Sequence, residues 1–232
     1  MATPNSPRIT LNPPNHHTTQ SNPQNPPPPI AFLTGTWHVT HSSLPLWKDK
    51  RNVSITYTAI PSTNADTGTG TTPGSGIDHD TTKLDDLVQY QSRNPLKSKV
   101  HTVHGIDTPS LSNPGAWDWR GKGWLMIASS HWEVLGFGEI ASERAGDGTG
   151  TEPENGSGSG TEAMTAGEEE GNAWVVTYFA KTLFTPAGID VYSRRKEGVS
   201  QHVLEGIFEA LRGLQVREIG VLVDGVFEIP RD

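Results

Sequence analysis

The residues that could carry chemistry in this chain are histidines and acidic residues, because the sequence contains nine histidines and no cysteine. His131 and Glu133 stand two apart in a stretch with the alternation of a β-strand, so their side chains point to the same side. A carboxylate beside an imidazole raises the basicity of the ring. The pair is therefore a candidate general base. The same spacing also fits an outward, solvated pair opposite an inward Trp132.

Metal binding is not expected from the other histidines. Two pairs are three residues apart on expected strands, which places the partners of each pair on opposite faces: His38 with His41, and His101 with His104. His16 and His17 lie in an N-terminal segment with no apolar run to form a core, and the lack of cysteine removes a thiolate zinc site. We predict no metal site and no cofactor.

Aromatic residues form the second group of candidates, because seven tryptophans is a high count for this length. Large flat rings that carry one polar group commonly line small-molecule cavities. We expect ligand-binding positions at six of the aromatic residues: Trp47, Tyr57, Tyr90, Trp119, Trp132 and Tyr178. Core packing remains the alternative for each of them.

The elements that must position these side chains are β-strands. Alternating apolar and polar residues between Gly, Pro and Asn predict strands at Phe32–Thr40, Asn52–Ile60, Leu84–Gln91, Lys99–Ile106, Ala116–Arg120, Trp124–Ala128, Ala173–Lys181 and Gly188–Arg195. The apolar pattern of Trp124–Ala128 runs on through Trp132–Phe137, either as one long bent strand or as two strands. Gly121 and Gly123 predict a tight hairpin turn before Trp124. Parallel neighbours would need crossovers of a dozen or more residues, so we predict up-and-down antiparallel pairing.

A change of period marks the C-terminal part. From Val199 the apolar residues fall at helical spacing, Ser200 can cap the start of this helix, and Gly213 marks its end. Arg217–Val223 is predicted to be a last strand. Closing the sheet removes its exposed edges and leaves an interior wide enough for one small ligand. We therefore predict an all-β fold, an antiparallel barrel of about 8–10 strands with one C-terminal amphipathic helix, with a β-sandwich as the alternative.

Three polar segments dilute this folded body. They are a Pro- and Asn-rich tail, residues 1–30, and two inserts of Gly, Thr, Ser and Glu at about 62–82 and 143–172. Their composition offers too little apolar surface to offset the entropy of ordering, so we expect disorder there. Residues 31–232 are then one barrel domain.

Charge and hydropathy restrict the partners and the location. A net charge of −8 argues against nucleic acid, which demands a basic patch. No run of about twenty apolar residues and no secretion signal is present, so we expect a soluble, cytoplasmic protein without a membrane span. The oligomeric state stays open.

One motif and the order of elements resemble a known family. Gly35-Thr36-Trp37 on the first expected strand, followed by about eight strands and an amphipathic helix, resembles the lipocalins of the calycin superfamily. In that family the tryptophan lies across the closed end of the barrel, often stacked with an arginine from the last main strand. The resemblance implies these roles for Trp37 and for Arg194, with Arg195 also suitably placed. The family's disulfide is absent here, so the resemblance implies an intracellular, lipocalin-like protein.

These features lead to an expected function with alternatives. The barrel is expected to bind a small apolar molecule that is aromatic, lipid or terpenoid-like. The alternative is an isomerase, cyclase or hydro-lyase of secondary metabolism that uses the same cavity with His131, Glu133 or Tyr178. Nitrobindin-type haem barrels also begin with Gly-Thr-Trp, but their axial histidine lies on a late strand, where this sequence has none.

Overall fold

The computed structural model describes residues 9–17, 25–60, 82–140, 171–183 and 185–232 of the chain. The expected disorder of the two inserts, and of the tail at residues 1–8 and 18–24, concerns residues outside these ranges almost entirely. The fold below is that of the described residues.

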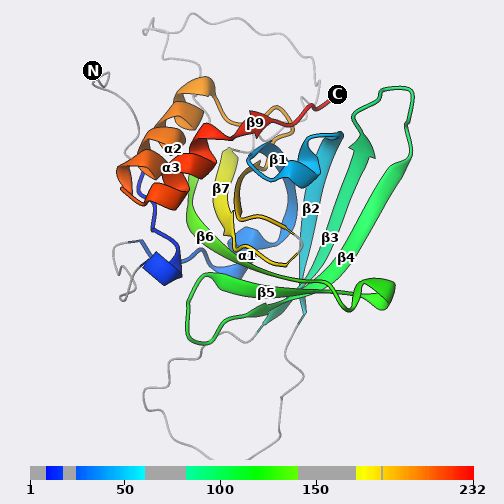
Figure 1. Cartoon of the computed structure of the whole chain (residues 1–232), viewed down its shortest axis with the longest axis horizontal. Helices are drawn as coiled ribbons and strands as arrows, with labels where there is room; N and C mark the ends of the chain where they lie inside the picture. The colour runs from blue at the N-terminus through cyan, green and yellow to red at the C-terminus, as the bar shows by residue number, and fades with distance from the viewer. Residues whose placement is uncertain (1–8, 18–24, 61–81, 141–170, 184) are drawn as a thin grey trace, which may run out of the picture.

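Eight strands close into an antiparallel barrel (Figure 1). Consecutive strands pair with one another from β1 to β8, and β1 also pairs with β8, which closes the ring. The strands are β1 Gly35–Ser42, β2 Lys50–Ile60, β3 Lys83–Ser92, β4 Val100–Pro109, β5 Ala116–Gly121, β6 Ser129–Ile140, β7 Asn172–Phe179 and β8 Gly188–Ser193. A two-residue strand, β9 Phe227–Glu228, pairs with the end of β1. The predicted all-β, up-and-down antiparallel barrel is confirmed.

Strand β7 shows how one element contributes to two apolar layers. Its side chains alternate, so Ala173 and Val175 join the cluster inside the barrel, while Trp174 and Val176 join a second cluster outside it. Both faces of the strand are therefore buried. The inner cluster lines the barrel interior, and the outer cluster lies between the barrel wall and the helices.

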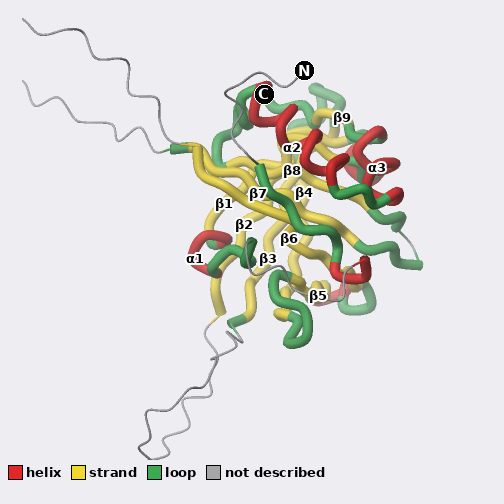
Figure 2. Tube along the Cα trace, turned by 90° about the vertical axis from the view of Figure 1, so that its left-hand side faces the viewer, coloured by secondary structure: helices red, strands yellow, loops and turns green. Residues whose placement is uncertain are grey.

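Two C-terminal helices cover the outer cluster. Helix α2, Gln201–Gly213, begins where predicted, with the Ser200 side chain accepting a hydrogen bond from the Val203 backbone amide. It buries Ile207 and Leu211 against the barrel wall. The second helix, α3 Arg217–Asp224, lies next to α2 on the same side of the barrel (Figures 1 and 2). None of the helices in the described ranges is long and apolar enough to cross a membrane.

The prediction of a strand at Arg217–Val223 is wrong, because this segment is helix α3, Arg217–Asp224. The burial explains the difference. Ile219 and Val223, four residues apart, are both buried, while Val221 is 66% exposed. A strand would have put all three side chains on one face.

The start of the first strand and the second arm of the expected hairpin also differ from prediction. Residues Ile30–Leu33 form a short helix, α1, and β1 begins only at Gly35. After β5 the chain makes a 3-10 turn, η3 Gly123–Leu125, and β6 begins at Ser129 rather than near Trp124. This turn packs so tightly that a Cβ on Gly121 would lie 2.4 Å from the Leu125 carbonyl oxygen.

Part of the expected disordered tail packs on the barrel. Leu11 is buried over Gly136, where an added Cβ would lie 2.3 Å from a Leu11 methyl carbon. The Asn12 backbone amide donates a hydrogen bond to the Leu135 carbonyl at 2.7 Å. Gly136 on β6 therefore leaves space for the Leu11 side chain, which the polar composition of the N-terminal segment did not lead us to expect in the core.

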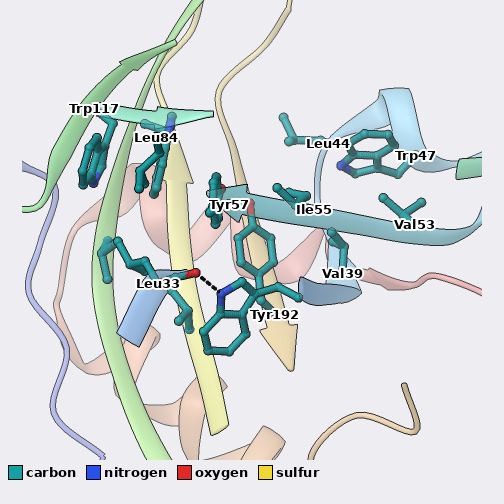
Figure 3. Packing of buried hydrophobic residues seen from close by; sticks show 14 of the residues in the cluster. Leu33, Val39, Leu44, Trp47, Val53, Ile55, Tyr57, Leu84, Trp117 and Tyr192 are labelled. Carbon is teal, nitrogen blue, oxygen red and sulfur yellow. Dashed lines mark hydrogen bonds between the residues drawn. The ribbon is translucent and has the colours of Figure 1, made fainter. Parts of the chain in front are cut away.

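Helix α1 lies across one end of the barrel (Figure 1), where it meets Trp37. The Trp37 indole donates a hydrogen bond to the Leu33 carbonyl at 2.8 Å, drawn as the dashed line in Figure 3. The guanidinium carbon of Arg194 lies 3.7 Å from the centre of the indole ring. Arg194 also donates hydrogen bonds to the carbonyls of Phe32 and Thr34. The closed end is thus held by one arginine that stacks on a ring and binds the backbone of the chain entering β1.

Candidate functional site

The barrel interior is lined by a row of stacked aromatic rings. Trp132 of β6 stacks on Trp117 of β5, with ring centres 5.8 Å apart, and on Tyr57 of β2, with ring centres 5.7 Å apart. Phe179 stacks on Trp132 from β7. Tyr57 of β2 and Tyr192 of β8, the two strands that flank β1, also point into this interior (Figure 3). The antiparallel register sets Trp117 directly opposite Trp132, which explains the central contact.

The structure gathers five of the six expected ligand-binding aromatics on the inner cluster. Tyr57 and Trp132 lie at its centre, Trp119 packs at its side, and Trp47 and Tyr90 meet edge to face, with ring centres 6.1 Å apart. Tyr178 lies elsewhere. It belongs to the outer cluster beneath the helices, and its hydroxyl donates a hydrogen bond to Glu218 of α3. Tyr178 therefore does not share a site with the other five.

Two buried aspartates project into the same interior. Asp86 stands opposite Tyr57, and Asp107 stands opposite Trp119 on the neighbouring strand. The Trp132 indole donates a hydrogen bond to Asp107 at 2.7 Å. Burial raises the pKa of Asp107 to about 7, although that hydrogen bond opposes the shift.

The pKa of Asp86 is also raised, and a second acid beside it contributes to the shift. Burial first, and then the neighbouring Asp107, raise the pKa of Asp86 well above its usual range, against a hydrogen bond from Trp119. Two carboxyl groups in such a site titrate as a pair. Burial and mutual repulsion therefore both favour the protonated form of this pair, in which a carboxyl group donates as well as accepts hydrogen bonds.

A glycine creates the space for this arrangement. Gly105 faces Asp86 across the β3–β4 pair, and a Cβ there would lie 2.2 Å from the Trp119 indole nitrogen. Only a residue without a side chain lets the Trp119 ring lie across β4. The ring can then reach Asp86.

Several polar atoms of this interior have no hydrogen-bond partner among the described residues. They are Asp86 Oδ1, Asp107 Oδ2 and Trp117 Nε1. Buried polar groups are paired in the great majority of cases, because an unpaired one costs about 1–3 kcal/mol. Such a concentration in one aromatic-lined space is characteristic of a site whose partner is a ligand or bound water.

A third aspartate lies toward the end of the barrel that carries the 3-10 helix η2, Pro45–Trp47. The Ser42 hydroxyl donates to Asp190 Oδ1 at 2.5 Å, and the Trp47 indole donates to Asp190 Oδ2 at 3.3 Å. Burial raises the pKa of Asp190 to about 7 in spite of these two donors. Unlike the pair on β3 and β4, this carboxyl group has a partner for each oxygen.

The candidate catalytic pair lies on the outer face of the barrel. His131 Nδ1 lies 2.8 Å from an oxygen of the exposed Asp118, and Nε2 lies 3.5 Å from an oxygen of the buried Glu133. The hydrogen bond to Glu133, with that to Asp118, raises the pKa of His131 to about 9. At neutral pH the ring is a cation between two carboxylates, so it cannot accept a proton as a general base would.

Sequence reasoning missed the interior aspartates. The pattern Leu84, Asp86, Val88, Tyr90 places all four side chains on one face of β3, but a charged residue within an alternating strand is normally assigned to the solvent side. The same holds for Asp190 between Ile189 and Val191. The signal that could have found Asp86 and Asp190 is their spacing. Each lies an even number of residues from a tyrosine of its own strand, Tyr90 and Tyr192, and therefore points to the same face as that tyrosine.

Comparison with known proteins adds little to this geometry. No protein-family model matches the chain, and no curated protein does. Among solved structures the chain is similar to the siderocalin Ex-FABP, described as functioning through dual ligand specificities, with 13% sequence identity and a TM-score of 0.41. The match covers 86% of this chain and 95% of that one. A likeness of this degree carries no conclusion about what this chain binds.

Proposed function

We propose that the barrel interior binds a small molecule with an apolar, ring-sized body and a hydrogen-bonding group such as a hydroxyl. The observation that supports it most is the set of unpartnered polar atoms on Asp86, Asp107 and Trp117, in an interior lined by stacked rings. The rings suit an aromatic or terpenoid-like body. The carboxyl groups suit its polar end, because a ligand that pairs them removes the cost of their burial.

This proposal refines the expectation of a purely apolar ligand. A hydrocarbon in the same space would leave Asp86 Oδ1 and Asp107 Oδ2 unpaired, so it would gain only the contribution of apolar burial. A ligand with one well-placed hydroxyl gains that burial and one or two hydrogen bonds as well. The expected preference is thus for an amphipathic molecule over its hydrocarbon analogue.

An enzyme on the same barrel is the second candidate, and one observation favours it. The pKa values of Asp107 and Asp190 are both raised by burial to about 7, where a carboxyl group can give and take protons at physiological pH. An isomerase, cyclase or hydro-lyase would use Asp107 as its acid or base, because that carboxyl has a free oxygen toward the interior. Asp107, rather than His131 or Tyr178, is the residue to substitute in a test for turnover.

Titration with N-phenyl-1-naphthylamine, an apolar fluorescent probe, tests the location of the site. Binding inside the barrel should quench tryptophan fluorescence, because Trp117, Trp119 and Trp132 lie at the inner cluster. Trp132→Ala should weaken the probe by about 1–2 kcal/mol through lost ring contact.

Matched substitutions outside the barrel serve as controls. Phe208→Ala on α2 and Tyr178→Phe on β7 alter only the outer cluster, so they should leave the affinity for the probe unchanged. If Phe208→Ala weakens the probe and a folded Trp132→Ala does not, the binding site lies under the helices and the proposal is wrong.

A further inference from the structure

We propose that His16, His17 and Glu218 form a binding site for a divalent transition-metal ion such as Zn²⁺ on the outer face of the barrel. Two adjacent histidines of the N-terminal segment meet one carboxylate of α3, more than two hundred residues later in the chain. The sequence predicts no metal site, because His16 and His17 were assigned to a disordered tail. The site is independent of the barrel interior.

The ligand atoms are close enough to share one ion. His16 Nε2 and His17 Nε2 each lie 3.1 Å from Glu218 Oε2, and the three ligand atoms lie within 4.8 Å of one another. Tetrahedral zinc with ligand bonds of about 2.1 Å separates its ligand atoms by about 3.4 Å. The two distances from the histidines to the carboxylate would therefore have to lengthen by only about 0.3 Å to hold an ion.

The local backbone explains how adjacent histidines reach one point. Residues Asn15–His17 form a 3-10 turn, η1, in which the His17 amide donates to the Pro14 carbonyl at 2.8 Å. The Asn15 amide donates to Glu133 Oε2 at 2.8 Å, which ties this turn to β6. The two imidazole rings then lie 4.0 Å apart and turn the same edge toward Glu218.

Glu218 is oriented by a residue behind it. The Tyr178 hydroxyl donates to Glu218 Oε1 at 3.0 Å, which leaves Oε2 directed at both histidines. Metal-binding carboxylates are usually held in this way by a hydrogen bond to the oxygen that does not bind the ion. Glu218 also stands beside the fully buried Ile219, so α3 fixes its position.

The surroundings leave space for further ligands of the ion. His16, Tyr178 and Glu218 line a groove of about 480 Å³ that also contains His131 and Glu133. Two imidazoles and one carboxylate with an open position are a donor set used by zinc and iron(II) sites. The ion would thus be reached from solvent and would keep water or a small anion as its fourth ligand.

Isothermal titration of the full chain, prepared without a polyhistidine tag, with ZnCl₂ tests the site. One ion per chain should bind to the unaltered protein. Glu218→Gln and His17→Ala each remove one ligand and should abolish this binding or weaken it by more than about tenfold, whereas Tyr178→Phe should weaken it by about tenfold through loss of the orienting hydrogen bond. His202→Ala, which removes an exposed histidine of α2 outside the cluster, is the matched control and should change nothing.

A second measurement separates loss of ligands from loss of fold. Zn²⁺ should raise the melting temperature of the unaltered chain, because it binds the folded state alone, and should raise it much less in Glu218→Gln. Circular dichroism of the ion-free variants should match that of the unaltered chain, since all three ligands are partly exposed. The proposal is overturned if the unaltered chain binds no Zn²⁺, or if folded Glu218→Gln and His17→Ala bind it as tightly as His202→Ala does.

Discussion

Single residues decide the chemistry of the barrel interior, and the aspartates are the clearest case. Asp107 and Asp86 are buried among stacked rings, and each keeps one oxygen without a partner. Such groups destabilise the folded chain, so their presence calls for a reason other than packing. A ligand with a polar group provides one.

The cost of a buried carboxyl group can be measured at Asp190. Its pKa is raised by burial from about 3.9 in the unfolded chain to about 7 in the folded one. The folded state then binds the proton more tightly, so this residue lowers stability progressively as the pH rises from about 4 to about 7. Three pKa units correspond to about 4 kcal/mol at most.

Asp190→Asn should remove this dependence. The free energy of unfolding of the variant relative to the unaltered chain should rise by several kcal/mol between pH 4 and pH 8, measured by urea denaturation at both values. Asn keeps a similar shape and an acceptor for Ser42 or Trp47. Parallel pH profiles for the two proteins would show that Asp190 ionises normally in the folded state.

His131 titrates in the opposite sense. Its hydrogen bonds to Glu133 and Asp118 raise its pKa to about 9, so the contribution of these contacts to stability is present below about pH 6.5 and is lost as the pH rises through 9. Proton NMR of the imidazole signals should find one histidine that titrates near pH 9. Asp118→Asn should lower that pKa, whereas a value near 6.5 in the unaltered chain contradicts the observed pairing.

Most aromatic residues that the sequence assigns to the barrel interior or to its closed end lie there, while their role in ligand binding stays a prediction. Trp132 and Tyr57 line the interior as expected, and Trp37 meets Arg194 at the closed end. Asp86 could not be found because an alternating strand has two faces, and polarity normally marks the outer one. The prediction that Tyr178 lines the interior differs from the structure because both faces of β7 are buried. The apolar pattern of this strand therefore does not distinguish its inner face from its outer face.

At the scale of elements, periodicity identified the eight barrel strands and α2, but it also predicted a strand at Trp124–Ala128 that is absent and missed α3. Arg217–Val223 is short and rich in β-branched residues, so propensity favours a strand. Packing against α2 decides otherwise, because the outer cluster accepts Ile219 and Val223 from one face of a helix. Tertiary contacts override local preference in segments of this length.

Two substitutions within α3 test its helical face. Ile219 is fully buried, so Ile219→Ala should lower the free energy of unfolding by about 2–5 kcal/mol. Val221 is largely exposed on the same element, so Val221→Ala should change stability by less than about 0.5 kcal/mol. Chemical denaturation measures both. Equal losses would indicate a strand, in which the two side chains share a face.

The whole molecule combines a closed barrel with an outer layer formed by both ends of the described chain. Helices α2 and α3 cover β7 and β8, and residues 9–17 run along β6 (Figures 1 and 2). The sequence predicts the barrel because alternation over eight strands leaves few other closures. It does not predict the N-terminal layer, because one buried leucine in a polar segment is not a pattern, and only the fit of Leu11 over Gly136 reveals it.

At this scale the central claim is that the barrel interior selects a molecule with an apolar body and a hydrogen-bonding group. Paired titrations with 2-naphthol and naphthalene, monitored by tryptophan fluorescence, test it most directly, because the two probes share one ring system and differ by a single hydroxyl. A hydrogen bond to an unpartnered interior oxygen is worth about 1–2 kcal/mol, so 2-naphthol should bind roughly tenfold more tightly. Asp107→Leu should abolish the preference, while Asp118→Leu on the outer face should keep it. Equal affinities of the unaltered chain for the two probes, or an undiminished preference in a folded Asp107→Leu, would contradict the claim.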